Sequence, residues 1–173
     1  FVEEREMTVM LVGDLSASER FGTTTASKAR VPAEVAALCA FSAIKHNDRV
    51  GLILSTDQIE KIVPPKKGQK HVMRVVREIL GAKPERTGTD LGVALETLYS
   101  VARRRSVAFV LSDFFAEGYE RALALASARH DVIPCILVDP RDEDLPDVGL
   151  ASFEDLETGE SVAKGCVAAP PAD

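Results

Sequence analysis

Short, nearly unbroken apolar runs alternate along this chain of 173 residues with longer segments of helical periodicity. Each apolar run predicts a β-strand; the runs are Met7–Val12, Arg49–Leu54, Val107–Leu111 and Val132–Val138. Because consecutive residues are apolar, we expect these strands to be covered on both faces, as in a parallel sheet. Ile59–Val63 predicts an additional edge strand that Pro64 ends.

The segments between these strands predict helices. After Gln69, apolar residues recur at i, i+3, i+4, i+7 and i+8, which gives a helix with one apolar face. Val31–Ile44 is apolar almost all round and predicts a well-buried helix, and two more helices are expected after Thr89 and over Tyr119–Arg129. Alternating strands and helices predict an α/β fold of three layers, in which helices cover both faces of a mostly parallel, Rossmann-like sheet with one antiparallel edge strand.

The chain shows no internal repeat and no linker, so a single domain is predicted over residues 1–162. Within it, Ala151–Val162 is expected to form a last strand or a hairpin. Residues 163–173 are expected to be a flexible C-terminal tail.

Composition narrows the classes of function. The chain has 27 acidic and 21 basic residues and a net charge of −6, so no nucleic-acid partner is expected. No apolar run reaches the roughly 18–20 residues of a membrane span, so we expect no membrane contact by this fragment. The three cysteines (Cys39, Cys135 and Cys166) are far apart and form no CxxC motif, which favours reduced thiols and a cytoplasmic location.

Hydroxyl and carboxylate side chains follow the predicted strands at one edge of the sheet. Asp14, Ser16 and Ser18 come after the first strand, Asp113 comes after the strand at Val107–Leu111, and Thr89 precedes a helix that should begin at the same edge. Hard oxygen ligands suit Mg²⁺, Mn²⁺ or Ca²⁺ and do not suit Zn²⁺. Singly, each residue could be a turn residue, a loop hydroxyl or a helix N-cap. Their expected convergence favours a divalent cation site, most simply for Mg²⁺.

Three motifs at this edge resemble those of a known family. The segment Asp14–Ser18 reads D-x-S-x-S, Gly88–Leu95 reads G-T-x-x-G-x-A-L, and Ser112-Asp113 follows later. In this order they resemble the metal-ion-dependent adhesion site of von Willebrand factor A domains. The chain is more closely similar to a bacterial branch known as domain of unknown function family 58, through Asn47–Leu52, Pro64–Gly68, Ser112–Phe114, Asp139-Pro140 and Leu145–Gly149.

This resemblance implies a von Willebrand factor A-like fold that binds a divalent cation, usually Mg²⁺. By position, the metal ligands would be Asp14, Ser16, Ser18, Thr89 and Asp113. It also implies a non-enzymatic role, in which an acidic side chain of a partner protein completes the coordination. Members of the branch are associated with MoxR-type AAA+ ATPases as adaptors or assembly factors, and their parent proteins often carry membrane segments. Glu19 departs from the pattern, because many relatives have Met there.

Two other classes of function stay open at this point. A Mg-dependent phosphohydrolase would usually need a second Asp two residues after Asp14, where this chain has Ser16, which cannot transfer a proton at neutral pH. A serine hydrolase would need a GxSxG motif and a partnered histidine, but His46, His71 and His130 fall at predicted helix ends and are expected at the surface. The second alternative is a scaffold of the same fold that holds no metal.

Overall fold

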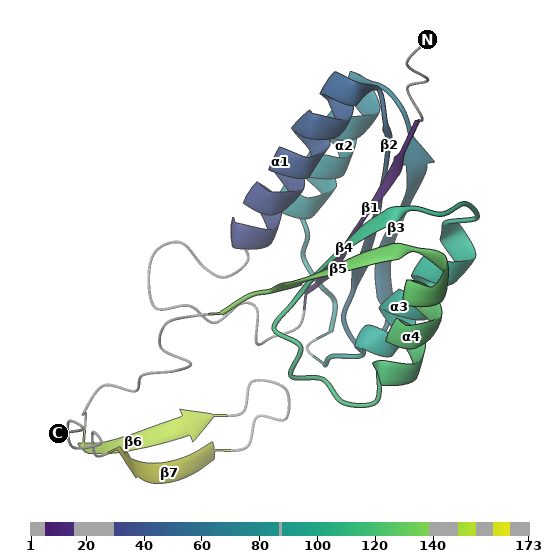
Figure 1. The fold of residues 1–173 in the computed structure, drawn as a ribbon. Helices are drawn as coiled ribbons and strands as arrows, with labels where there is room; N and C mark the ends of the chain where they lie inside the picture. The colour runs from purple at the N-terminus through teal and green to yellow at the C-terminus, as the bar shows by residue number, and fades with distance from the viewer. Residues whose placement is uncertain (1–5, 16–29, 87, 139–148, 155–160, 167–173) are drawn as a thin grey trace, which may run out of the picture.

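A computed structural model describes residues 6–15, 30–86, 88–138, 149–154 and 161–166. Its main sheet has five strands in the order β3-β2-β1-β4-β5 (Figure 1). The strands are β1 (Thr8–Asp14), β2 (Arg49–Ser55), β3 (Ile59–Lys66), β4 (Val107–Ser112) and β5 (Asp131–Ile136). All neighbours pair in parallel except β2 and β3, which are antiparallel. The prediction of a mostly parallel sheet with one antiparallel edge strand is therefore confirmed.

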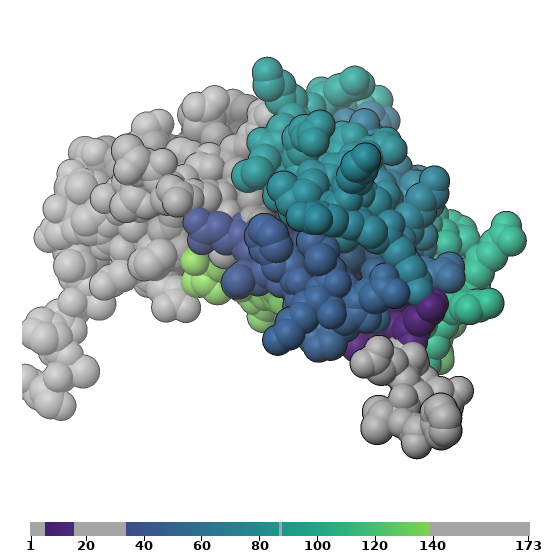
Figure 2. Space-filling model, turned by 90° about the horizontal axis from the view of Figure 1, so that it is seen from above, coloured from purple at the N-terminus to yellow at the C-terminus, as the bar shows by residue number. Residues whose placement is uncertain are grey.

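Helices cover both faces of this sheet. They are α1 (Arg30–His46), α2 (Gln69–Leu80), α3 (Leu91–Val101) and α4 (Glu120–Arg129). Figure 1 shows α1 and α2 together on one face and α3 and α4 together on the other. From above, α1 and α2 form one continuous blue-to-teal surface (Figure 2). The three layers agree with the arrangement expected from the sequence.

The central strand β1 divides the hydrophobic core in two. Val9 and Leu11 pack toward α1 and α2, whereas Met10 and Val12 pack toward α3 and α4. This division follows from the alternation of side chains along a strand. Because both faces are covered, β1 needs apolar residues at every position, which explains its unbroken apolar run.

The prediction that the first helix is well buried is wrong for much of its surface. Its buried positions are the small residues Ala36, Ala40 and Ala43, which face the sheet, whereas Leu38 is 72% and Phe41 58% exposed. Alanines allow the helix to approach the sheet closely and leave the longer side chains on the outer side. Composition indicated burial, but the sheet covers only one side of this helix.

Both outer strands of the main sheet contain proline. β3 includes Pro64 and Pro65, and β5 includes Pro134. The sequence prediction ended β3 before Pro64, but the strand continues to Lys66. Proline is tolerated there because an edge strand has one row of backbone groups that pairs with no neighbouring strand.

The remaining strands form a separate sheet. β6 (Gly149–Glu154) and β7 (Ser161–Cys166) pair in antiparallel fashion, so the predicted strand or hairpin at Ala151–Val162 is a hairpin. β7 continues beyond the boundary predicted at residue 162, and residues 167–173 lie outside the described part of the chain. Among the described helices, none has both the length and the apolar character that crossing a membrane requires.

Candidate functional site

The carboxyl ends of β1, β2 and β4 bring polar side chains together. Asp14, the last residue of β1, is in register with Ser55 of β2, and Gly13 is in register with Leu111 of β4. This register puts Ser112 beside Asp14, and the Ser112 Oγ donates a hydrogen bond of 3.0 Å to the Asp14 Oδ2. Two segments almost a hundred residues apart in the sequence are thus joined by one buried hydrogen bond.

The two carboxylate oxygens of Asp113 differ in their surroundings. Its Oδ1 accepts a hydrogen bond of 3.1 Å from the backbone N–H of Phe115. Its Oδ2 is buried and has no hydrogen-bond partner, in a residue that is only 6% exposed. Leaving a buried acceptor unsatisfied costs about 1–3 kcal/mol, and more when the group is charged. An oxygen in this position is suited to a ligand that brings a positive charge.

The turn after Asp113 is held in an unusual backbone conformation. Phe114 has φ of 60°, in the left-handed region that residues with a side chain seldom adopt. Its backbone N–H donates a hydrogen bond of 3.1 Å to the Ser112 Oγ, the same oxygen that donates to Asp14. Ser112 therefore fixes both the turn and the Asp14 carboxylate. Ser112 is not among the ligands predicted from the sequence, although its place next to Asp113 at a strand end is the signal that could have indicated its role.

The loop that carries Thr89 is tied to the same edge. The backbone N–H of Asp90 donates a hydrogen bond of 3.0 Å to the carbonyl of Thr56, which directly follows β2. The Asp90 Oδ1 accepts a hydrogen bond of 3.1 Å from the backbone N–H of Val93 and so caps α3. Asp90 is the N-cap of this helix, so the alternative that Thr89 serves as the cap does not hold.

An ion pair and a close backbone approach place this loop against the turn between β2 and β3. The Arg86 guanidinium forms an ion pair of 2.9 Å with the Asp57 carboxylate. A Cβ atom at Gly88 would lie 3.2 Å from the Cβ of Asp57, which is closer than most side chains tolerate. A residue without a side chain therefore suits position 88, next to Thr89.

The structure thus brings Asp14, Thr89 and Asp113 to one edge of the sheet, while Ser16 and Ser18 lie outside the described residues. Within the described ranges, no group of three or more His, Cys, Asp or Glu side chains could hold a metal ion. This finding is compatible with the predicted set, because its other three members are hydroxyl residues. The metal role of all five residues stays a prediction.

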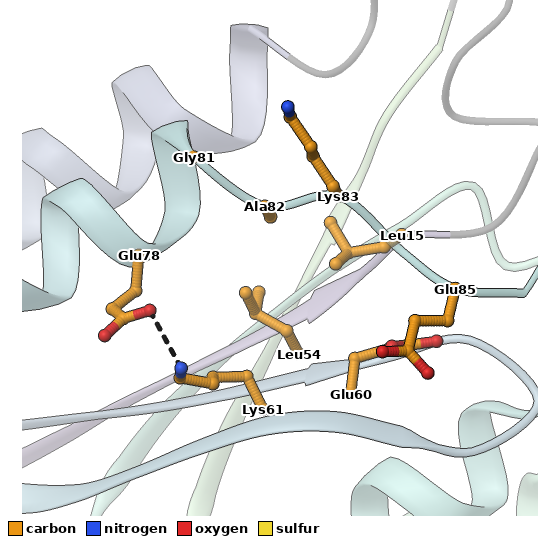
Figure 3. A pocket seen from close by; sticks show the side chains of 9 residues that line it. All are labelled: Leu15, Leu54, Glu60, Lys61, Glu78, Gly81, Ala82, Lys83 and Glu85. Carbon is orange, nitrogen blue, oxygen red and sulfur yellow. Dashed lines mark ion pairs between the residues drawn. The ribbon is translucent and has the colours of Figure 1, made fainter.

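A pocket of about 240 Å³ lies next to Leu15, the residue after Asp14. Figure 3 shows the carboxylates of Glu60 and Glu85 on one side of it and an ion pair between Lys61 and Glu78, 3.1 Å long, on the other. The Thr56 Oγ1 donates a hydrogen bond of 2.9 Å to Glu60. The pocket is therefore rimmed by charges of both signs, several of which are engaged in contacts within the chain.

None of the three histidines supplies a base at this edge. His46 contacts the carbonyl of Ser42, and His71 contacts the carbonyl of Val50 near the start of β2. His130 was expected at the surface, but it is only 2% exposed and neither ring nitrogen has a hydrogen-bond partner. It lies between α4 and β5, at the amino edge of the sheet. Burial lowers the pKa of His130, and the nearby Arg129 adds to this effect.

The family model described as "Protein of unknown function DUF58" matches residues 1–166 of the chain. The chain belongs to the DUF58 family. An uncharacterised protein of Mycobacterium tuberculosis is 34% identical over 161 residues, which are 91% of this chain and 51% of the relative. An uncharacterised protein of Mycobacterium avium is 35% identical over 100 residues, or 56% of this chain and 59% of the relative. The DUF58 chain thus spans about half the length of its mycobacterial relatives.

Solved structures show the fold of this DUF58 domain to be von Willebrand factor A-like. An aerotolerance-related membrane protein from Bacteroides fragilis has a TM-score of 0.69 at 18% identity, and the match covers 92% of this chain and 81% of that chain. A von Willebrand factor type A protein from Catenulispora acidiphila has a TM-score of 0.53 at 16% identity, over 75% of this chain and 32% of that chain. The family resemblance and the fold predicted from the sequence are both confirmed.

Proposed function

We propose that this DUF58 domain is a non-enzymatic protein-interaction module that binds a divalent cation, most simply Mg²⁺, and docks an acidic side chain of a partner protein. The ligands would be Asp14, Ser16, Ser18, Thr89 and Asp113. The partner proposed is a MoxR-type AAA+ ATPase, for which the domain would act as an adaptor or assembly factor in the cytoplasm. The von Willebrand factor A-like fold favours such an interaction role over catalysis.

The observation that supports this proposal most is the unpartnered Oδ2 of Asp113. It is a buried carboxylate oxygen at the sheet edge where ligands of α/β folds collect. The Oδ1 of the same side chain is held by the Phe115 N–H, so the carboxylate has a fixed orientation. An oriented acceptor without a donor is what a hard cation requires from a ligand.

The other residues of the edge would position the ligands. Ser112 orients Asp14 through its hydroxyl, and the contact between Asp90 and Thr56 holds the loop of Thr89. A divalent cation held there would supply an open coordination position for a carboxylate of the partner. The surrounding strand ends would exclude water from the contact and strengthen the charge-assisted bond.

Thermal unfolding with and without metal tests the cation site. We expect millimolar Mg²⁺ or Mn²⁺ to raise the melting temperature of the wild-type chain and not that of Asp14→Ala, since binding to the folded state at 100 times Kd adds about 2.7 kcal/mol. Asp131→Asn is the matched control, because Asp131 is exposed and paired with Arg105 at the opposite edge. Equal melting curves with and without metal for the wild-type chain would contradict the site.

Capture of the proposed ATPase tests the partner. We expect a purified MoxR-type AAA+ ATPase from the same organism to bind the immobilised chain in Mg²⁺ and to be released by EDTA. Asp113→Ala should abolish the binding, while Asp131→Asn should keep it. Binding that survives both EDTA and Asp113→Ala would exclude docking through the cation.

A metal-free scaffold is the second candidate, and one contact favours it. The Ser112 hydroxyl already satisfies the Asp14 Oδ2, so these two residues could simply join β1 to β4. In that case Asp14→Ala would lower the stability equally with and without metal. The melting experiment therefore separates the two candidates.

A further inference from the structure

Two neighbouring pockets form one groove between α3 and α4. The first has a volume of about 470 Å³ and is lined by Asp90 and Arg121, near the starts of the two helices. The second has about 250 Å³ and reaches Tyr99, farther along α3. Glu96, Ala122 and Leu125 line both pockets, so the two pockets adjoin, and together they are called the groove here.

The groove starts at the candidate site. Asp90 follows Thr89 directly and is bonded to the carboxyl end of β2 through Thr56. α4 begins soon after Asp113, so both helices start at the carboxyl edge and run away from it (Figure 1). A partner segment that places one side chain at the edge would therefore find the groove within reach of its next residues.

The far part of the groove is apolar and accessible. Leu125 is 53% and Tyr99 48% exposed, while Leu95 and Ala122 form a buried floor beneath them. The Arg129 guanidinium lies 4.6 Å from the centre of the Tyr99 ring, which holds the ring in place at the end of the groove. Exposed aliphatic and aromatic groups around a shaped floor suit an aliphatic side chain of a partner.

The two helices that form the groove carry opposite charges at different distances from the carboxyl edge of the sheet. Arg121 lies on α4 near the carboxyl edge, and Glu96 lies on α3 farther from it. Neither of them forms an ion pair with another residue of the part of the chain that the structure describes. Arg121 would favour an acidic side chain approaching the edge, and Glu96 would favour a basic side chain beyond it.

We propose that the groove between α3 and α4 binds the continuation of the partner segment whose acidic side chain docks at the carboxyl edge. The segment would be an extended peptide with an acidic residue, a basic residue opposite Glu96, and an aliphatic residue between Leu125 and Tyr99. Glu96 lies about 9 Å beyond Asp90 at roughly 1.5 Å per helical residue. An extended chain spans that distance in about three residues, at ~3.3 Å each. This inference rests on the proposed function of the edge.

A random-peptide phage library selected on the full 173-residue chain in millimolar Mg²⁺ tests the inference. We expect enriched peptides to contain Asp or Glu, with Lys or Arg about three residues away and an aliphatic residue next to it. Glu96→Lys should replace the basic preference by an acidic one. Leu125→Asp should remove the aliphatic preference and weaken binding of the selected wild-type peptides about tenfold.

Leu80→Asp is the matched control, because Leu80 is also an exposed leucine at the surface of a helix but ends α2 on the opposite face of the sheet. It should leave the selected motif unchanged. Acidic peptides enriched only with Mg²⁺, but without a basic or aliphatic preference and unaffected by Glu96→Lys, would overturn the groove alone. A selection with no preference for acidic residues in Mg²⁺ would overturn both the groove and the proposed function of the edge.

Discussion

Replacing Asp113 by asparagine should have opposite effects on stability with and without a divalent cation. In the metal-free fold, the Oδ2 of Asp113 is a buried carboxylate oxygen without a hydrogen bond. Asparagine has nearly the same shape and keeps an acceptor for the Phe115 N–H, but it carries no charge. Because burial of an unpaired charge costs more than burial of a neutral amide, Asp113→Asn should raise the free energy of unfolding by about 1–3 kcal/mol in EDTA.

With saturating Mg²⁺ the wild-type chain should instead have the higher free energy of unfolding. The wild-type chain should gain about 2.7 kcal/mol at 100 times Kd, whereas Asp113→Asn should gain nothing. For a chain of this size, each kcal/mol corresponds to roughly 2–4 °C in melting temperature, so calorimetry can resolve both effects. The variant should thus be more stable than the wild-type chain in EDTA and less stable in Mg²⁺. This reversal is the result expected if the fold orients the Asp113 carboxylate before the cation binds.

The result that would refute this reasoning is a variant that is less stable than the wild-type chain by the same amount in EDTA and in Mg²⁺. Asp113 would then stabilise the fold through a contact within the chain, and its Oδ2 would not be a cation ligand. Asp131→Asn provides the control, because its carboxylate lies at the opposite edge and is exposed. Exposed ion pairs of this kind contribute less than about 1 kcal/mol, with no dependence on metal.

Three further outcomes are expected. Ser112→Ala should lower the free energy of unfolding by about 1–3 kcal/mol in urea titrations, since the Asp14 Oδ2 and the Phe114 N–H would lose their common partner; an unchanged midpoint would contradict that contact. Because its pKa is lowered in the fold, His130 should make the chain less stable as the pH falls below about 6.5, where only the unfolded state takes up the proton readily. Urea midpoints for His130→Gln should show a flatter pH dependence than those of the wild-type chain. Phe115→Ser should change stability by less than about 0.5 kcal/mol, because the side chain is 76% exposed, but it should weaken ATPase capture if this aromatic residue beside Asp113 contacts the partner; unchanged capture would exclude that contact.

Much of the fold could be predicted from periodicity. A sheet covered on both faces requires unbroken apolar runs in its strands and apolar residues at helical spacing in the helices that cover it. α2 begins at Gln69 and ends at Leu80, as its apolar spacing and Gly81 indicated. Other features depended on neighbours that are remote in the sequence. The exposure of Leu38 follows from which side of α1 the sheet covers, and His130 is buried at the junction of α4 and β5; no local pattern contains either piece of information.

The candidate site was predictable to the same extent and for a related reason. In a parallel sheet, strand ends share one edge, so the placement of Asp14 and Asp113 followed from the strand assignment alone. The assignment of the cap to Asp90 and the double role of Ser112 required backbone geometry that residue types do not specify. Whether these residues bind a cation stays a prediction that the melting experiments can decide.

The prolines of the two outer strands have a consequence for how this domain can meet other molecules. Pro64 and Pro65 remove two backbone donors from β3, and Pro134 removes one from β5. Neither β3 nor β5 therefore has an unbroken set of backbone N–H donors with which a foreign strand could pair. Pairing with a foreign strand is therefore disfavoured at both outer strands of the main sheet, and recognition by this sheet is left to side chains.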